Sequence, residues 1–123
     1  MQIITVSPDV LDQALSTACA VLSAGGLIVY PTETVYGLGC DATNPVGVQK
    51  MLEVKNRPAG KAVSVMVTDQ AMAEQYVRLN TTARSLYERF MPGPVTIVSA
   101  GKDKVDPRLP AENGRLGIRM SSH

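Results

Sequence analysis

Apolar side chains recur at two different spacings along the chain, and the alternation of these spacings predicts helices and strands in turn. Between residues 10 and 22 the apolar positions lie three or four apart, which is the spacing of one face of a helix. Ser7-Pro8 before this stretch is typical of a helix start, and Gly25-Gly26 after it is typical of a helix end. Further helices are predicted from Asn44-Pro45 to about Lys55, and within residues 70–90 with Asp69 and Thr81 as N-caps.

Short apolar or β-branched runs between these helices predict strands. The runs are residues 2–6, 27–30, 62–67, 95–99 and 115–120, and residues 101–114 form a polar loop. Because strands alternate with helices, we expect an α/β layered domain. Some connections are too short for right-handed crossovers, so the open sheet is expected to be mixed, with helices flanking it. An edge strand so close to residue 123 suggests a fragment, or a chain that closes its sheet with another copy.

Composition and charge narrow the function. The 123 residues are 45% hydrophobic and 4% aromatic, which suits one globular domain and disfavours binders that stack several bases on aromatic rings. All twelve Lys and Arg residues lie in residues 50–123 with seven acids, a net charge of +5. Residues 1–49 hold four acids and no Lys or Arg, a net charge of −4. The later part could therefore line an anion site or form a solvated basic face.

Several classes of protein are disfavoured by the residues themselves. Two cysteines and a single histidine, His123, form no metal motif, and they fit a reducing, cytoplasmic setting. No signal peptide or membrane-spanning run is recognisable. Residues 37–42 match G-x-G-x-x-A, but the next helix starts too late for a dinucleotide site, and the glycine that a P-loop needs before Gly60-Lys61 is missing. No nucleophile–base pair is present, which leaves chemistry by positioning and electrostatics, as in nucleotidyl transfer.

Three segments are the candidates for a binding site. In residues 30–39, hydroxyl groups and glycines follow a buried strand, although an ordinary turn would look the same. In residues 55–64, three cations stand without a carboxylate; they could bind a polyphosphate, although such a run seen alone is more often a solvated basic loop. In the last strand, Arg115 and Arg119 share one face, where an inward arginine needs an anionic partner; a water-facing edge is the alternative.

Together these segments resemble the Sua5/YrdC/YciO family, and within it the threonylcarbamoyl-AMP synthases. The resemblance rests on four motifs in order: PTETVYGL at residues 31–38, Lys55-x-Arg57-Pro58 with Lys61 and Ser64, PGPVT at residues 92–96, and Gly117-Ile118-Arg119-x-x-x-His123. Lys55-x-Arg57 favours the synthase branch over the YciO branch. The family's later Ser-x-Ala-Asn-type loop is absent, so we expect residues 1–123 to be a single YrdC-like domain without the family's C-terminal portion.

The resemblance implies a twisted sheet around a basic concave cavity, and a reaction of L-threonine, bicarbonate and ATP with Mg²⁺. The products would be L-threonylcarbamoyladenylate, which serves N6-threonylcarbamoyladenosine (t6A) modification of tRNA, and pyrophosphate. As partners, the resemblance implies tRNA or double-stranded RNA and other proteins of t6A modification, and no membrane. Lys55 and Arg57 would be catalytic. L-threonine would be bound by Thr32, Thr34, Tyr36 and Arg119, and ATP phosphates by Lys55, Arg57, Lys61, Ser64 and Arg115, with no protein-bound metal.

A different function remains open at this point. The same basic surface could hold double-stranded RNA or tRNA through phosphate contacts without catalysis. Such binding would weaken steeply with added salt and would not respond to threonine.

Overall fold

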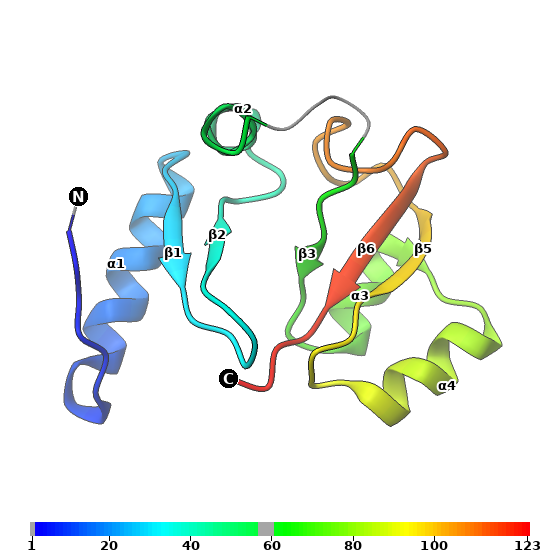
Figure 1. Cartoon of the computed structure of the whole chain (residues 1–123), viewed down its shortest axis with the longest axis horizontal. Coiled ribbons are helices and arrows are strands. Elements are labelled where there is room, and N and C mark those ends of the chain that lie inside the picture. The colour runs from blue at the N-terminus through cyan, green and yellow to red at the C-terminus, as the bar shows by residue number, and fades with distance from the viewer. Residues whose placement is uncertain (1, 57–60) are drawn as a thin grey trace.

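The computed structural model describes residues 2–56 and 61–123 (Figure 1). It contains helices and strands that alternate along most of the chain. In order they are the 3-10 helix η1 (Pro8–Val10), α1 (Leu11–Ser23), β1 (Ile28–Tyr30), β2 (Gly37–Gly39), α2 (Pro45–Val54), β3 (Val65–Met66), α3 (Gln70–Tyr76), β4 (Val77–Arg78), α4 (Thr81–Phe90), β5 (Ile97–Gly101) and β6 (Arg115–Arg119).

The strands form two separate hydrogen-bonded sheets. β1 and β2 make an antiparallel pair in which Tyr30 lies opposite Gly37. The other four strands are ordered β3-β6-β5-β4, with β3 parallel to β6 and the remaining pairs antiparallel. The prediction of a mixed sheet with flanking helices is therefore confirmed.

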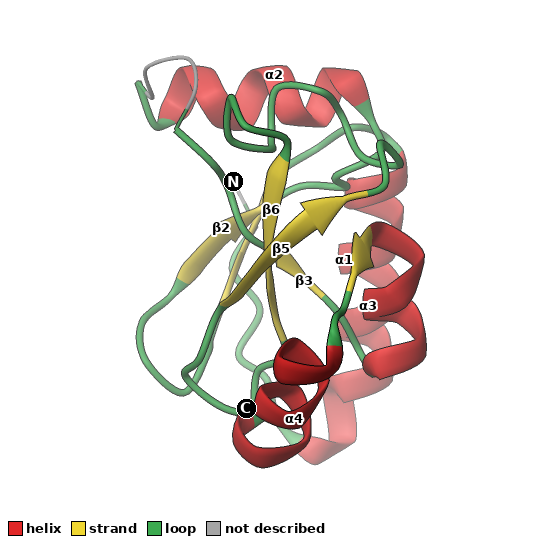
Figure 2. Ribbon diagram, turned by 90° about the vertical axis from the view of Figure 1, so that its right-hand side faces the viewer, coloured by secondary structure: helices red, strands yellow, loops and turns green. Residues whose placement is uncertain are grey.

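The main core lies between the four-stranded sheet and its helices. Leu116 and Ile118 of β6 are 1% and 0% exposed, and they pack with buried residues of α3, α4 and β5. Because side chains alternate across a strand, Arg115 and Arg119 lie on the opposite face, as the sequence predicted. Figure 2 shows α1, α3 and α4 on one side of the strands, with α2 across one end. The helices thus leave one face of β6 available for polar side chains.

A second, smaller core lies beneath α2. Val48 and Met51 of α2 are buried against Leu109, and Leu38 of β2 packs against this group. Leu109 belongs to the segment predicted as a polar loop, yet it is 1% exposed. The segment after β5 therefore folds back and helps to hold α2 in place.

Side-chain caps explain where the helices begin. The Asn44 side chain accepts hydrogen bonds from the main chain at the start of α2, and Asp69 does so for α3. At α4 the cap is Asn80, whose Oδ1 accepts from Ala83 N at 2.8 Å, so the prediction of Thr81 as the cap was wrong by one residue. Gly25, with φ of 68°, follows the end of α1 in a conformation that glycine adopts easily.

Strand predictions were less accurate than helix predictions. Residues 2–6 form no strand, and Ile3 is 82% exposed. This prediction was wrong because a short apolar run does not by itself supply a neighbouring strand to pair with. The strand expected over residues 62–67 is limited to β3, and the strand expected over 95–99 is shifted to β5. Within the described residues, no helix has the length and apolar character needed to cross a membrane.

Candidate functional site

The first and the last of the three candidate segments meet through an ion pair. Glu33, in the loop between β1 and β2, receives a hydrogen bond from Nη2 of Arg119 at the end of β6. The same nitrogen donates to Thr34 Oγ1 at 2.9 Å. The Glu33 and Arg119 side chains are only 16% and 19% exposed. The anionic partner that an inward Arg119 needs is therefore a carboxylate of the chain itself.

Glu33 also fixes the segment that follows β6. Its Oε2 accepts from the Ser121 hydroxyl and, at 3.1 Å, from the main-chain N–H of Ser122. In Figure 1 this segment runs beside the β1–β2 loop. The hydrogen bonds from Ser121 and then Arg119 lower the pKa of Glu33 to about 2, so the carboxylate stays ionised at neutral pH.

The loop that carries Glu33 is shaped by its threonines. Thr32 Oγ1 accepts from the main-chain N–H groups of Thr34 and Val35, both at 3.2 Å, and donates to the Val35 carbonyl at 2.6 Å. The Thr32 and Thr34 hydroxyl oxygens lie 3.1 Å apart. This local turn brings Thr34 toward Arg119. Thr32, Thr34 and Arg119, all predicted to bind threonine, are thus gathered in one place.

Tyr30 lies over the glycines of β2. A Cβ built on Gly37 would lie 2.8 Å from Tyr30 Cζ, and one on Gly39 would lie 2.8 Å from Tyr30 Cε1. Only glycine allows this close approach of the ring. Burial raises the pKa of Tyr30, and the charge of Arg119 partly opposes that shift. The phenol therefore belongs to the surroundings of the Glu33–Arg119 pair.

A third glycine opens the polar face of β6. A Cβ on Gly117 would come within 2.7 Å of Ser64 Oγ and 3.0 Å of Thr96 Cγ2. Ser64, a predicted phosphate ligand, thus lies above the strand between the positions of Arg115 and Arg119. The structure brings Ser64 to the same face as the two arginines.

No hydrogen bond or ion pair within the described residues joins the predicted phosphate-binding lysines to the Glu33–Arg119 pair. Lys55 is the exposed residue at the end of α2, and its charge lowers the pKa of Cys40, which burial raises more strongly. Lys61 and Arg115 are also exposed, and Arg57 lies outside the described residues. Their gathering around one polyphosphate stays a prediction. Tyr36, predicted to contact threonine, is 75% exposed, outside the Glu33–Arg119 hydrogen bonds.

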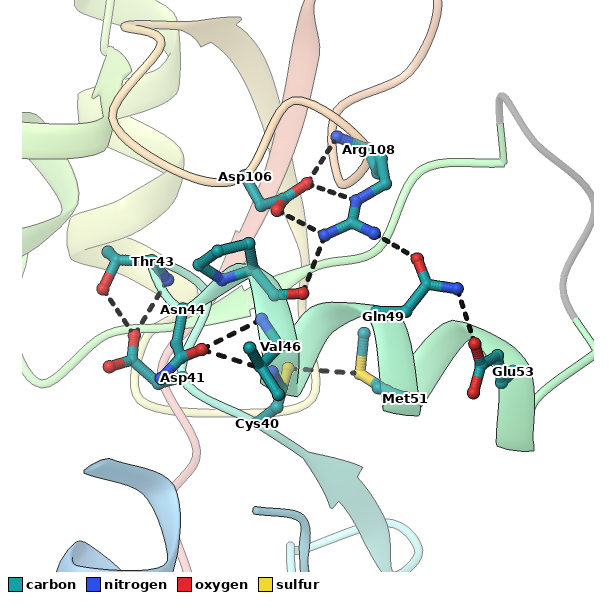
Figure 3. A network of polar contacts seen from close by, with 12 residues as sticks. Cys40, Asp41, Thr43, Asn44, Val46, Gln49, Met51, Glu53, Asp106 and Arg108 are labelled. Carbon is teal, nitrogen blue, oxygen red and sulfur yellow. Dashed lines mark hydrogen bonds and ion pairs between the residues drawn. The ribbon is translucent and has the colours of Figure 1, made fainter. Parts of the chain in front are cut away.

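A polar network fixes α2, the helix that ends just before Lys55. Asp106, 8% exposed, accepts from Arg108 Nε at 2.8 Å and from Arg108 Nη2 at 2.7 Å (Figure 3). Arg108 also donates to the Pro45 carbonyl at 2.8 Å and to the Gln49 side chain. The guanidinium lowers the pKa of Asp106, so the pair remains charged. The loop after β5 is thereby tied to the start of α2.

The described residues do not fit a magnesium site built by the protein alone. Within residues 2–56 and 61–123, no group of three or more His, Cys, Asp or Glu side chains is arranged to hold a metal ion. Both oxygens of Glu33 are engaged by donors of the chain. Mg²⁺ commonly binds through one or two carboxylates together with substrate phosphates and water. The involvement of Mg²⁺ with ATP stays a prediction.

A groove of about 410 Å³ lies elsewhere, between α4 and β5. Leu86, Phe90 and Val98 line it, and no predicted site residue does. Its lining is mainly apolar, which does not suit phosphate or carboxylate recognition. Thr96 of the PGPVT motif also lines the groove, but the apolar lining does not match the predicted ligands.

Comparison with known proteins shows the family of this chain. The profile of a family described as telomere recombination, which covers Sua5, YciO and YrdC proteins, matches residues 20–123. The threonylcarbamoyl-AMP synthase of Stenotrophomonas maltophilia (strain K279a) is 34% identical over 112 residues, which are 89% of this chain and 60% of that protein. This chain thus spans about 60% of the length of that relative.

Solved structures give the same result. The H234A/Y235A form of P. abyssi Sua5 superposes with a TM-score of 0.92 at 30% identity, over 100% of this chain and 36% of that one. A crystal structure of P. abyssi Sua5 complexed with L-threonine has a TM-score of 0.86 at 29% identity, over 91% of this chain and 33% of that one. Fold and sequence together define a YrdC-like α/β domain. The chain belongs to the Sua5/YrdC/YciO family.

Sequence reasoning missed Glu33 and Ser121 as members of the site. Glu33 is the one carboxylate between Asp12 and Asp41, and it stands between two threonines that were singled out. That isolation was the available signal. Its partner Arg119 is 86 residues away, a separation that no local pattern bridges.

Proposed function

We propose that this chain is the YrdC-like domain of an L-threonylcarbamoyladenylate synthase, acting on L-threonine, bicarbonate and ATP. Relatives named threonylcarbamoyl-AMP synthase support the reaction, and the P. abyssi Sua5 complex supports threonine as ligand. The observation that carries the proposal is the hydrogen bond of 2.9 Å between Arg119 Nη2 and Thr34 Oγ1, which unites two motifs far apart in sequence. The product would serve t6A modification of tRNA in the cytoplasm, with other proteins of that modification as partners.

The proposed chemistry is nucleotidyl transfer to a carbamate. The neutral amine of threonine takes up the carbon of bicarbonate with loss of water and forms a carbamate. A carbamate oxygen then attacks the α-phosphorus of ATP, the bond between the α-phosphorus and the bridging oxygen breaks, and pyrophosphate leaves with the electron pair. The protein has to align two anions and offset the charge of the leaving group.

The residues divide between these two tasks. In the proposal Arg119, Thr32, Thr34 and Tyr36 bind the threonine and its carboxylate, because a guanidinium pairs well with carboxylate oxygens. Lys55, Arg57, Lys61, Ser64 and Arg115 bind the phosphates of ATP, which enters with Mg²⁺. Lys55 and Arg57 are the groups proposed to stabilise the charge that develops on pyrophosphate.

The test measures pyrophosphate release by the 123-residue chain with ATP, bicarbonate and L-threonine. We expect threonine-dependent release that falls at least about tenfold in Lys55→Ala, because a charge at the leaving group is lost. Arg89→Ala is the matched control, since Arg89 lies on α4 over the ring of Phe90. Equal rates in Lys55→Ala and the unsubstituted chain would contradict the role of Lys55.

Calorimetry with each substrate separates the synthase from an RNA-binding module. The proposal expects L-threonine and ATP to bind to the chain. Absence of threonine binding, together with binding of duplex RNA that weakens steeply with salt, would favour the RNA-binding alternative.

A further inference from the structure

We propose that Glu33 is a positioning residue that holds the guanidinium of Arg119 ready for the carboxylate of the bound amino acid. The inference rests on the proposed function, because it concerns the threonine side of that site. It adds a residue that makes no contact with substrate and acts only through Arg119.

The hydrogen bonds of Glu33 suit a holding role. Oε1 is taken by Arg119, and Oε2 is taken by the Ser121 hydroxyl and the Ser122 N–H at 3.1 Å. Donors from the last residue of β6 and from the two serines that follow it thus fix both oxygens of one carboxylate. With three donors of the protein on its two oxygens, Glu33 is less suited to bind a ligand or to move a proton than to fix the position of Arg119.

The donors of Arg119 show what remains for a ligand. Nη2 serves both Glu33 and Thr34, so the guanidinium is fixed at one corner. Its Nε–H is buried and has no acceptor among the described residues. A buried donor without an acceptor is costly, and a carboxylate that binds a guanidinium commonly accepts from two of its nitrogens. Arg119 is therefore held in place while at least its Nε–H is still without a hydrogen-bond acceptor.

Ordering in advance affects affinity. A free arginine loses much rotamer freedom when it binds a ligand, and a partner that holds it beforehand removes part of that cost. The opposite interpretation makes Glu33 an internal competitor that occupies the place of the ligand carboxylate. The two interpretations predict opposite changes in threonine affinity when Glu33 is replaced. Removal of a competitor would tighten threonine binding, and removal of a positioning group would weaken it.

The experiment compares Glu33→Gln with Glu74→Gln in the 123-residue chain. Glu74 is the matched control because it is a carboxylate of α3 that pairs with Arg84 of α4 at 3.0 Å and forms no hydrogen bond or ion pair with Arg119 among the described residues. Calorimetry measures the affinity for L-threonine, for L-threoninamide, which lacks the carboxylate, and for ATP. We expect Glu33→Gln to weaken threonine binding by roughly three- to tenfold and to narrow the preference for threonine over threoninamide.

ATP affinity should not change in Glu33→Gln, and Glu74→Gln should change none of the three affinities. A general loss of structure would lower all affinities together and would leave the ratio of threonine to threoninamide unaltered. Ser121→Ala is the milder variant in case Glu33→Gln does not fold, because it removes one donor to Glu33 and keeps the ion pair. It should change the ratio in the same direction by a smaller factor.

Positioning can also be read without any ligand, from the ¹⁵N-resolved Nε–H signal of Arg119. We expect a signal protected from solvent exchange in the unsubstituted chain and in Glu74→Gln, and loss of that protection in Glu33→Gln. Tighter threonine binding, an unchanged ratio or a retained signal in Glu33→Gln would each overturn the inference. Failure of the unsubstituted chain to bind threonine would instead overturn the proposed function, and the Nε–H signal would still decide whether Glu33 positions Arg119.

Discussion

Substitution of Gly37 by alanine tests whether the ring of Tyr30 is the reason why β2 has glycine at this position. The added Cβ would lie 2.8 Å from Tyr30 Cζ, 3.0 Å from Oη and 3.1 Å from Cε1. Carbon atoms in contact normally stand about 3.5–4.0 Å apart, so the ring or the strand has to shift by about half an ångström or more. Overpacking of this kind costs about 1–3 kcal/mol.

An opposing effect has to be included. Replacement of glycine by alanine restricts the unfolded chain and stabilises the fold by about 0.4–1 kcal/mol where the backbone accepts it. Gly37 has no positive φ, so this gain applies. The net expectation for Gly37→Ala is a loss of about 0.5–2 kcal/mol in the free energy of unfolding.

Urea unfolding followed by circular dichroism measures this loss, and Tyr30→Val supplies the control background. Without the ring, Gly37→Ala should become neutral or stabilising, so the double-mutant cycle should give a coupling energy of about 1–3 kcal/mol. An equal cost of Gly37→Ala in both backgrounds would refute the steric explanation. A stabilising Gly37→Ala in the unsubstituted chain would refute it as well.

Three other substitutions test the pairs and the core. Glu33→Gln should make the melting temperature depend less on pH in acid. The pKa of Glu33 is lowered from 4.5 to about 2 in the folded chain, so its carboxylate stabilises the fold above pH 4.5 and this stabilisation is lost as the pH falls toward 2. A melting temperature that falls as steeply with decreasing pH in Glu33→Gln as in the unsubstituted chain would contradict this. Asp106→Asn should lower the free energy of unfolding by about 1–3 kcal/mol in urea, because hydrogen bonds to a buried charge are weakened, and no loss would show that the link to Arg108 is unimportant. Ile118→Ala should cost about 2–5 kcal/mol, since the side chain is 0% exposed, and a loss below 1 kcal/mol would mean that the main core does not depend on β6.

Elements with a strong local pattern could be predicted from the sequence. The helical spacing that ends at Gly25-Gly26 and the cap at Asn44 correctly predict α1 and α2. Alternation in β6 correctly predicts which face carries Leu116 and which carries Arg119. In each case the local sequence preference agrees with the packing of that element in the core.

Elements that depend on distant contacts could not be predicted in this way. β2 is three residues long with a glycine at each end, and it exists because it pairs with β1 beneath the ring of Tyr30. β4 directly continues α3 and pairs only with the end of β5, so its two residues read as part of a helix. Within the site, the threonines and Arg119 carried a motif, whereas Glu33 gains its role only when β6 arrives beside it.

β1 and β2 form no backbone hydrogen bonds with the four-stranded sheet among the described residues, so the two sheets are expected to open locally at different rates. In α1 every residue is at least partly exposed, and β1 pairs with β2 alone among the described strands. Side-chain links such as Glu33–Arg119, rather than amide hydrogen bonds, connect the first third of the chain to β6. Amide protons of β1 and β2 should therefore exchange with solvent through a sub-global unfolding event of low free energy, while those between β5 and β6 should wait for the whole domain to unfold.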